Sequence, residues 1–384
     1  MNKTNAMIFL LSVLAGLMLM LVSPLHAAPE GITARGWTLI DQASGRELAA
    51  HQADVPLAPA SLTKLMTAYV LFSDIRKNKL SLGELLSVPE AAVRTDGATI
   101  FLQVGEQLSV DTLIQAMLVQ SASDATLTLV VAASGSESAF VERMNREAKR
   151  LGMTRTRFLN STGLSEPGHE STAHDMALLA RAMLRDFPER AAFFRQKELS
   201  HKGITFYSRN RLLWRDETVS GLKAGRSAQA GYCLVATAER GSQGRIAVVL
   251  GAKTDTLRAQ DALNLLNYGF EQFDSVLLYR AQQPIRIVPL YRGARSTVNL
   301  GFLQDFHLLT PRGTASRVKG EVITQQPVVA PVRRGQRLGT LRLTLDGKSI
   351  GDYPLVALHE VKVAGIFGRG WDSMRLFFSR WFSR

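Results

Sequence analysis

The spacing that best predicts chemistry in this sequence joins a serine to a lysine. Ser61 and Lys64 stand three residues apart in the segment Pro59-Ala60-Ser61-Leu62-Thr63-Lys64. On a helix, residues three apart share one face and lie about one turn from each other. An uncharged amine within reach of a serine hydroxyl can take its proton and produce a nucleophile. The pair therefore predicts covalent catalysis through Ser61.

The residues around this pair favour an uncharged lysine. The nearby side chains are apolar: Leu62, Leu65, Met66, Tyr69 and Val70. This composition predicts a helix that is buried nearly all round. Burial disfavours the ammonium form, and so does the positive end of the helix dipole. We expect Lys64 to act as a general base.

Two later segments complete a set of three motifs. They are Ser121-Ala122-Ser123-Asp124 and Gly221-Leu222-Lys223-Ala224-Gly225-Arg226. With Ser61 and Lys64 they resemble the low-molecular-mass penicillin-binding D-alanyl-D-alanine carboxypeptidases, whose motifs S-x-x-K, S-x-N and K-T-G occur in this order. The resemblance continues through residues 171–176, 210–214 and 345–348. It covers nearly the whole chain after the first 28 residues.

The resemblance implies a role for each matching position. Ser61 forms the acyl-enzyme, Lys64 activates it, and Ser121 passes a proton to the departing D-alanine. The backbone N–H groups of Ser61 and of a strand residue near Ser227 form the oxyanion hole. The implied substrate is a peptidoglycan stem pentapeptide, and β-lactams are the implied inhibitors. The implied substrate-binding residues are Lys223, Ser123, Gly225 and Arg226.

Two motifs depart from the family pattern. Ser123 stands where the family usually has asparagine, and Ala224 stands where it has threonine. Ala224 lacks the hydroxyl that helps to hold the substrate carboxylate. Arg226 replaces a common histidine, and its planar guanidinium matches carboxylate geometry. We therefore expect weak or specialised carboxypeptidase activity, with Arg226 partly compensating for Ala224.

Two other functions remain open. A degenerate relative could bind wall peptides or a partner protein without turnover. A β-lactamase would need a deacylating group, and Glu166 invites that comparison. However, Glu166 stands in a turn-like segment, residues 163–168, that lacks the wider β-lactamase motif.

The elements that must hold these motifs are mixed helices and strands. Helical spacing of apolar residues runs through 62–72, 112–133, 137–151, 173–185 and 261–270, and strands are expected at 37–41, 44–48, 235–238 and 246–251. This mixture and the resemblance predict an α+β fold: a three-layer catalytic domain like that of β-lactamases and transpeptidases over residues 29–281. Short β-rich runs then predict a small all-β domain over residues 282–362, with a tight turn at Asp346-Gly347.

The two ends of the chain predict where the protein works. Residues 1–28 have a basic start, an apolar stretch and a small-residue exit, as in a cleaved secretory signal peptide; an uncleaved membrane helix is the alternative. Residues 363–384 predict an amphipathic helix with aromatic side chains on one face and arginines on the other. We expect this helix to bind an anionic membrane surface rather than pack on the protein's own core. The predicted location is the periplasm, on the outer face of the inner membrane.

Composition excludes several other functions. The single cysteine, Cys233, lies in an apolar run, and the seven histidines show no metal-ligand spacing, so no metal or cofactor is expected. The net charge is +13. Because the basic residues are scattered and are not interleaved with aromatic ones, nucleic acid is not an expected partner. Anionic lipid and wall polymer remain.

Overall fold

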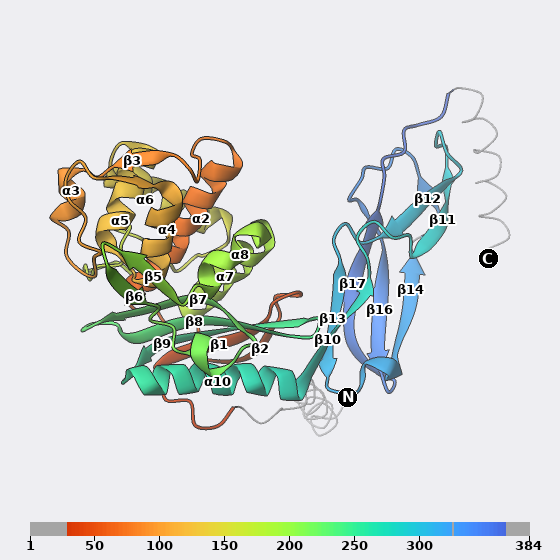
Figure 1. The fold of residues 1–384 in the computed structure, drawn as a ribbon. Helices are drawn as coiled ribbons and strands as arrows, with labels where there is room; N and C mark the ends of the chain where they lie inside the picture. The colour runs from red at the N-terminus through yellow and green to blue at the C-terminus, as the bar shows by residue number, and fades with distance from the viewer. Residues whose placement is uncertain (1–28, 325, 366–384) are drawn as a thin grey trace, which may run out of the picture.

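The computed structural model describes residues 29–324 and 326–365 (Figure 1). Its larger unit is built on a five-stranded antiparallel sheet in the order β2-β1-β9-β8-β7. Every residue of β1 is buried, as are most residues of β8 and β9, so the centre of the sheet is covered on both faces. The strands are β1 (Gly36–Asp41), β2 (Glu47–His51), β7 (Val219–Ser227), β8 (Gly231–Arg240) and β9 (Gln243–Ala252).

Helices form the two layers that cover this sheet. One face packs against α10 (Asp255–Gln272), and the other packs against α7 (Ala173–Asp186) and α8 (Ala191–Arg195) (Figure 1). The three-layer α+β catalytic fold that the sequence predicts is confirmed. The predicted signal peptide and residues 366–384 of the predicted C-terminal helix lie outside the described residues. The first residue predicted for that helix, Val363, forms a β-bridge with Gly293 instead.

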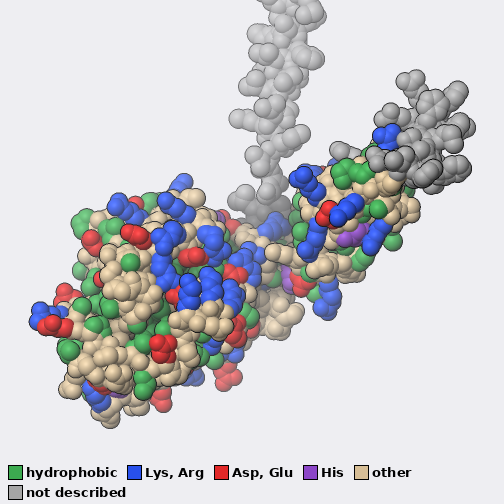
Figure 2. Space-filling view, turned by 90° about the horizontal axis from the view of Figure 1, so that it is seen from above, with side chains coloured by type: hydrophobic (Ala, Val, Ile, Leu, Met, Phe, Trp, Pro, Cys, Tyr) green, Lys and Arg blue, Asp and Glu red, His purple; other side chains and the backbone are tan. Residues whose placement is uncertain are grey.

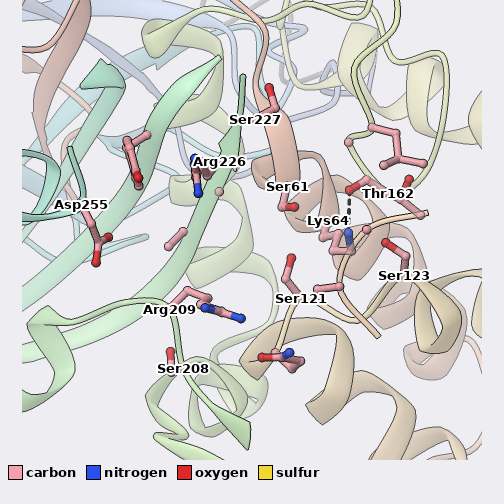
Figure 3. Close-up of a pocket in the computed structure, with 18 of the residues that line it drawn as sticks. Ser61, Lys64, Ser121, Ser123, Thr162, Ser208, Arg209, Arg226, Ser227 and Asp255 are labelled. Atoms are coloured by element: carbon pink, nitrogen blue, oxygen red, sulfur yellow. Dashed lines mark hydrogen bonds between the residues drawn. The ribbon is translucent and has the colours of Figure 1, made fainter. Parts of the chain in front are cut away.

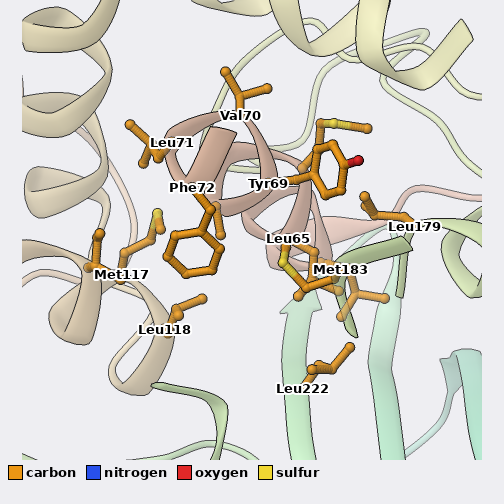
Figure 4. Close-up of a cluster of buried hydrophobic side chains, with 14 of the residues drawn as sticks. Leu65, Tyr69, Val70, Leu71, Phe72, Met117, Leu118, Leu179, Met183 and Leu222 are labelled. Atoms are coloured by element: carbon orange, nitrogen blue, oxygen red, sulfur yellow. The ribbon is translucent and has the colours of Figure 1, made fainter. Parts of the chain in front are cut away.

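A group of helices stands above the α7 face, with α2 (Thr63–Arg76) at its centre. Figure 4 shows Leu65 and Phe72 of α2 among side chains of the neighbouring helices and of β7. Nearly all of α2 is buried, as the apolar residues around Lys64 predict. The other helices of the group are α3 (Glu90–Val93), α4 (Val110–Val119), α5 (Ser123–Ser134) and α6 (Glu137–Arg150).

One sequence prediction is wrong at this point. The helix expected over 112–133 is two helices, α4 and α5, separated at residues 120–122. Ser121 has a positive φ of 67° and therefore cannot continue a right-handed helix. The break lies within the second of the three motifs.

Short elements complete the larger unit. Two small hairpins, β3–β4 and β5–β6, lie apart from the main sheet. A single 3₁₀ turn, η1 (Ala60–Leu62), leads into α2. The remaining elements are β3 (Leu85–Ser87), β4 (Gln107–Ser109), β5 (Glu198–His201), β6 (Ile204–Tyr207), η2 (Pro188–Arg190) and α9 (Leu212–Arg215).

The second unit consists of strands, as predicted. β10 (Phe273–Tyr279) leaves the end of α10 and pairs with β13 (Phe306–Pro311). A six-stranded sheet in the order β14-β16-β17-β12-β11-β15 encloses a separate hydrophobic core. Its strands are β11 (Arg286–Tyr291), β12 (Thr297–Gly301), β14 (Val318–Thr324), β15 (Val328–Val329), β16 (Arg337–Leu345) and β17 (Lys348–Ala357), with the turn η3 (Ala315–Arg317) before β14.

The predicted hairpin turn at Asp346-Gly347 joins β16 to β17, and both residues have positive φ. Among the described residues, no helix is both long and apolar enough to cross a bilayer.

Candidate active site

The predicted site residues meet at a cleft of about 890 Å³ between β7 and the helical group (Figure 3). η1 and α2 supply Ser61 and Lys64, the break between α4 and α5 supplies Ser121, and the start of α5 supplies Ser123. The edge strand β7 forms the opposite wall. Six of the seven predicted residues line the cleft: Ser61, Lys64, Ser121, Ser123, Gly225 and Arg226.

The backbone around Ser61 is tightly enclosed. Ala60 has a positive φ of 48°, an unfavourable conformation for a residue with a side chain. A Cβ on Gly163 would lie 2.0 Å from the carbonyl oxygen of Ala60. A Cβ on Gly225 would lie 2.9 Å from the backbone nitrogen of Ser61. Gly225 thus permits the close approach of β7 to the nucleophile's own backbone, and its role in substrate binding stays a prediction.

Lys64 has the environment that the sequence predicts. Its side chain is 1% exposed, and Nζ donates a hydrogen bond of 2.6 Å to the carbonyl oxygen of Thr162. Burial lowers the pKa of Lys64 from 10.5 to about 7, and the negative charges of Asp124 and Glu137 oppose part of this shift. Near neutral pH, a large fraction of the amine is therefore uncharged and able to accept a proton.

The loop that receives this hydrogen bond is held by polar side chains. The carboxylate of Glu137 accepts hydrogen bonds from the backbone N–H and the hydroxyl of Ser161, at 2.8 and 2.6 Å. Asn160 Oδ1 accepts from the backbone N–H of Gly163 at 2.8 Å. These contacts fix the position of the Thr162 carbonyl, which in turn orients Lys64.

The second motif brings two serines to the cleft. Ser121 is 7% exposed, and its hydroxyl oxygen has no hydrogen-bond partner among the described residues. The backbone N–H of Ser123 donates to the carbonyl of Ala98 at 2.6 Å. The next residue, Asp124, accepts from the backbone N–H groups of Ile100 and Leu102 and fastens the preceding loop to α5. The Ser121 hydroxyl is thus available to a bound molecule.

Lys223 is the predicted residue that does not line the cleft. It lies on β7 with 1% exposure, and its Nζ donates to the carbonyl of Ala224 at 3.0 Å. Burial, followed by the positive charges of Lys64, Arg258 and Arg209, holds the pKa of Lys223 well below its usual value. Its role as a carboxylate-binding cation stays a prediction.

Four arginines line the strand side of the cleft. Arg211 forms an ion pair with Asp255 at 2.5 Å, and Arg258 bonds the same carboxylate. Arg258 also donates to the carbonyl of Gly225 at 3.2 Å.

The other two arginines, Arg209 and Arg226, form no ion pair with a described residue, and both are exposed. Arg226 Cζ lies 5.1 Å from the centre of the Tyr232 ring. Figure 3 shows both near the two serines, Ser61 and Ser121. The cleft therefore has uncompensated positive charge suited to an anionic ligand.

Several residues of the site were not predicted. Glu137, Asn160 and Thr162 act through the loop beside Lys64, whereas Arg258 lies on α10 and Arg209 lies in the loop between β6 and α9. Glu137 begins α6, and Asn160 and Thr162 lie in a loop, so no apolar periodicity marked these residues in the sequence. The arginines gave no signal, because their clustering depends on the tertiary fold.

Two other polar residues, Glu166 and His169, do not line the cleft. Glu166 is exposed and is absent from the cleft lining. His169 is 4% exposed and hydrogen-bonds the Thr63 hydroxyl at 2.8 Å. Burial lowers the pKa of His169 to about 4, so it is neutral at physiological pH. Its contact with Thr63 supports the start of α2.

Two family models match the chain. A model described as D-alanyl-D-alanine carboxypeptidase matches residues 23–254, and one described as the C-terminal domain of penicillin-binding protein 5 matches residues 273–363. The stretch between the two matched ranges is α10, which covers one face of the main sheet.

Known proteins are similar over almost the full length. The D-alanyl-D-alanine carboxypeptidase DacC of Escherichia coli is 39% identical over 359 residues, covering 91% of this chain and 90% of that protein. DacA of the same organism is 35% identical over 359 residues, covering 91% and 89%. The crystal structure of penicillin-binding protein 5 from Haemophilus influenzae has a TM-score of 0.83 at 33% identity, covering 88% of this chain and 99% of that one. With its serine, buried lysine and two-unit architecture, this chain belongs to the D-alanyl-D-alanine carboxypeptidase family of serine-type penicillin-binding enzymes.

Proposed function

We propose that this enzyme removes the terminal D-alanine from peptidoglycan stem pentapeptides through an acyl-enzyme at Ser61. The observation that carries the proposal is the buried Lys64, whose pKa is about 7, one helical turn from a serine in an arginine-lined cleft. A substrate that ends in a carboxylate fits the two arginines without ion-pair partners, Arg209 and Arg226.

The reaction proceeds in two halves. Lys64 Nζ takes the proton of the Ser61 hydroxyl as its oxygen attacks the carbonyl carbon of the penultimate residue. The backbone N–H of Ser61 and one from β7 near Ser227 stabilise the oxyanion. The carbon–nitrogen bond then breaks, and Ser121 passes a proton to the departing amine. Water hydrolyses the resulting ester and releases the shortened peptide.

The same chemistry supports acylation by β-lactams. A β-lactam presents a strained amide next to a carboxylate, as the terminal dipeptide does. Penicillin-binding protein D2 of Listeria monocytogenes, which matches this chain at 34% identity and a TM-score of 0.58, has been crystallised in the ampicillin-bound form; the match covers 62% of this chain and 98% of that one. We therefore expect penicillin to form a covalent ester with Ser61.

The two altered motifs lower the rate of this activity or narrow its substrate range. Ala224 cannot donate a hydrogen bond to the substrate carboxylate, and Ser123 is shorter than the family's asparagine. Arg226 lies two residues along β7 and offers a charged, two-pronged donor in place of the missing hydroxyl. The proposal is a slower or more selective carboxypeptidase in which Arg226 takes part of the carboxylate-binding role.

A second function is favoured by one observation. Lys223 donates to the carbonyl of the adjacent Ala224 instead of lining the cleft. A chain that retains the shape but cannot complete the reaction would bind wall peptides or a partner protein without turnover.

Penicillin labelling separates these functions. Mass spectrometry of the intact protein after exposure to penicillin should reveal one adduct, absent from Ser61→Ala, that persists for many minutes. Release of D-alanine from a D-Ala-D-Ala pentapeptide by the same preparation supports the carboxypeptidase. An adduct without D-alanine release supports the binding protein, and rapid loss of the adduct with penicillin hydrolysis indicates a β-lactamase. If Ser61 is never acylated in the folded protein, the catalytic proposal fails.

The location is also a proposal. The sequence of residues 1–28 supports export, and that of residues 363–384 supports attachment to an anionic membrane surface. Together they favour a periplasmic enzyme held at the outer face of the inner membrane. Cell fractionation after expression of the full-length chain tests this: recovery in the cytoplasm with residues 1–28 intact would contradict it.

A further inference from the structure

We propose that the far end of the β unit is itself a docking surface for anionic phospholipid headgroups. This surface would bind the membrane together with residues 366–384, in addition to connecting them to the β unit. The inference adds to the proposed membrane attachment but does not depend on carboxypeptidase activity. It rests on three neighbouring segments, residues 291–296, 330–334 and 359–365, here called the basic rim.

Backbone hydrogen bonds join the three segments of the basic rim. The N–H of Ala294 donates to the carbonyl of Lys362 at 2.8 Å, and that of Ala364 donates to Arg292 at 2.8 Å. Val332 and Val361 exchange two hydrogen bonds of 2.9 Å. Side chains far apart in the sequence are therefore held together at one end of the sheet, beyond β11 and β12 (Figure 1).

The charge of the basic rim is strongly unbalanced. The acidic residue in these segments is Glu360, whereas the basic residues are Arg292, Arg295, Arg333, Arg334 and Lys362. All five basic side chains are exposed, and the last four form no ion pair with any described residue. At the opposite end of the sheet, two arginines are paired: Arg317 with Asp346 at 2.9 Å, and Arg342 with Asp352 at 3.0 Å.

Exposed apolar side chains accompany these charges. Val363 in the basic rim is 41% exposed, and Val329, which directly precedes the second segment of the rim, is 39% exposed. Figure 2 looks down on this end of the β unit and shows hydrophobic side chains among lysine and arginine side chains. Basic groups beside small apolar ones suit the interface of a bilayer, where phosphates meet acyl chains.

The position of the basic rim in the chain indicates that its ligand is a lipid surface. The described residues end at 365, in the basic rim itself, and the sequence that follows contains the aromatic and arginine pattern expected to bind a membrane. If residues 366–384 bind lipid, the rim is brought to the same surface. A wall polymer would also offer negative charge, but it would not explain the apolar side chains or the position of the rim at the chain's exit.

The test compares two full-length variants with the same charge change. The rim variant carries R295Q, R333Q, R334Q and K362Q. The matched variant carries R312Q, R317Q, K319Q and K348Q, which lie toward the opposite end of the sheet near the Asp346-Gly347 turn. Sedimentation with phosphatidylglycerol-containing vesicles measures partitioning, with phosphatidylcholine vesicles as the uncharged reference. D-Alanine release from a soluble peptide should be unchanged in both variants.

Each basic residue at an anionic surface strengthens partitioning by roughly fivefold. Because the rim variant loses four basic residues, we expect it to bind the anionic vesicles about 600-fold more weakly than the parent, and the matched variant to bind within about threefold of the parent. Equal losses in the two variants would overturn the proposal. So would unchanged vesicle binding in a rim variant that no longer binds isolated peptidoglycan, because the rim would then serve the wall.

A fluorescent label locates the contact directly. The natural cysteine, Cys233, is fully buried, so an introduced surface cysteine can be labelled selectively. An environment-sensitive dye on R334C should shift to shorter wavelength with anionic vesicles, and the same dye on K348C should not. If neither label responds although the protein sediments with vesicles, the terminal segment binds alone and the rim has no part in docking. If the protein does not sediment at all, both membrane proposals fail, and the peptidase assay is unaffected.

Discussion

Arg226 offers the sharpest test of how the altered third motif works. It is exposed at the cleft, forms no ion pair with a described residue, and lies beside Tyr232. We predict that Arg226→Ala lowers kcat/KM for a peptide ending in D-Ala-D-Ala, because the substrate carboxylate loses its charged partner. The side chain needs no rearrangement to meet a ligand, since no internal carboxylate competes for it.

The size of the effect follows from the exposure of Arg226. A hydrogen bond to a charged group contributes about 1.5–3 kcal/mol. Solvent screening reduces the contribution of an exposed guanidinium, so about 1–2 kcal/mol is expected here. This corresponds to a loss of about 5- to 30-fold in kcat/KM. Arg226→Lys should keep part of the activity, because it preserves the charge but not the paired donors.

Three controls separate carboxylate binding from other effects. Arg215→Ala removes an exposed arginine that is absent from the cleft lining and should leave kcat/KM unchanged. A substrate with an amidated end lacks the negative charge, so it should react equally with the parent and Arg226→Ala. In an Ala224→Thr background, the loss caused by Arg226→Ala should shrink, because the restored hydroxyl shares the contact.

Two results would refute this reasoning. One is an unchanged kcat/KM for Arg226→Ala on the D-Ala-D-Ala peptide. The other is an equal loss on the amidated and the free substrate, because Arg226 would then support the site without binding the carboxylate.

Other predictions concern the general base Lys64, the backbone contact at Gly163 and the buried Asp41–Arg245 ion pair. Because the pKa of Lys64 is about 7, the pH profile of kcat/KM should rise with an apparent pKa near 7 and then level off. The pKa of this lysine is lower in the folded chain than in the unfolded one, so its contribution to stability increases from about pH 7 toward pH 10.5. Urea unfolding at both ends of that range should detect this rise in the parent and a smaller rise in Lys64→Met, where Lys223 still contributes. Gly163→Ala should abolish penicillin labelling, since its Cβ meets a backbone oxygen at 2.0 Å, whereas Gly168→Ala, with a similar φ but no contact closer than 3.8 Å, should retain it. Asp41→Asn should lower the free energy of unfolding by about 3 kcal/mol in urea titrations, because it leaves the fully buried guanidinium of Arg245 without its anion; a loss below about 1 kcal/mol would contradict that view.

The elements that sequence predicted well are those whose pattern is local. The three motifs, the buried helix α2 and most of the β-rich runs each follow from residues close together in the chain. The small hairpins β3–β4 and β5–β6 were missed, because their strands are short and largely exposed. The arginine wall was missed for another reason: Arg209 and Arg258 are 49 positions apart and meet only because α10 packs on β8 and β9.

The break at Ser121 explains why a helix pattern failed at the point that matters for catalysis. Apolar spacing continues from α4 through α5, so periodicity alone predicts one helix. The conformation of residues 120–122 is decided by tertiary contacts, because Asp124 binds the backbone of the loop at Ile100 and Leu102 and the N–H of Ser123 binds Ala98. A continuous helix would satisfy its own backbone but would leave those loop N–H groups without an acceptor. The hydrogen bonds to the loop therefore outweigh those of a continuous helix, and Ser121 adopts a positive φ. As a result, its hydroxyl lies at the cleft without a hydrogen-bond partner among the described residues.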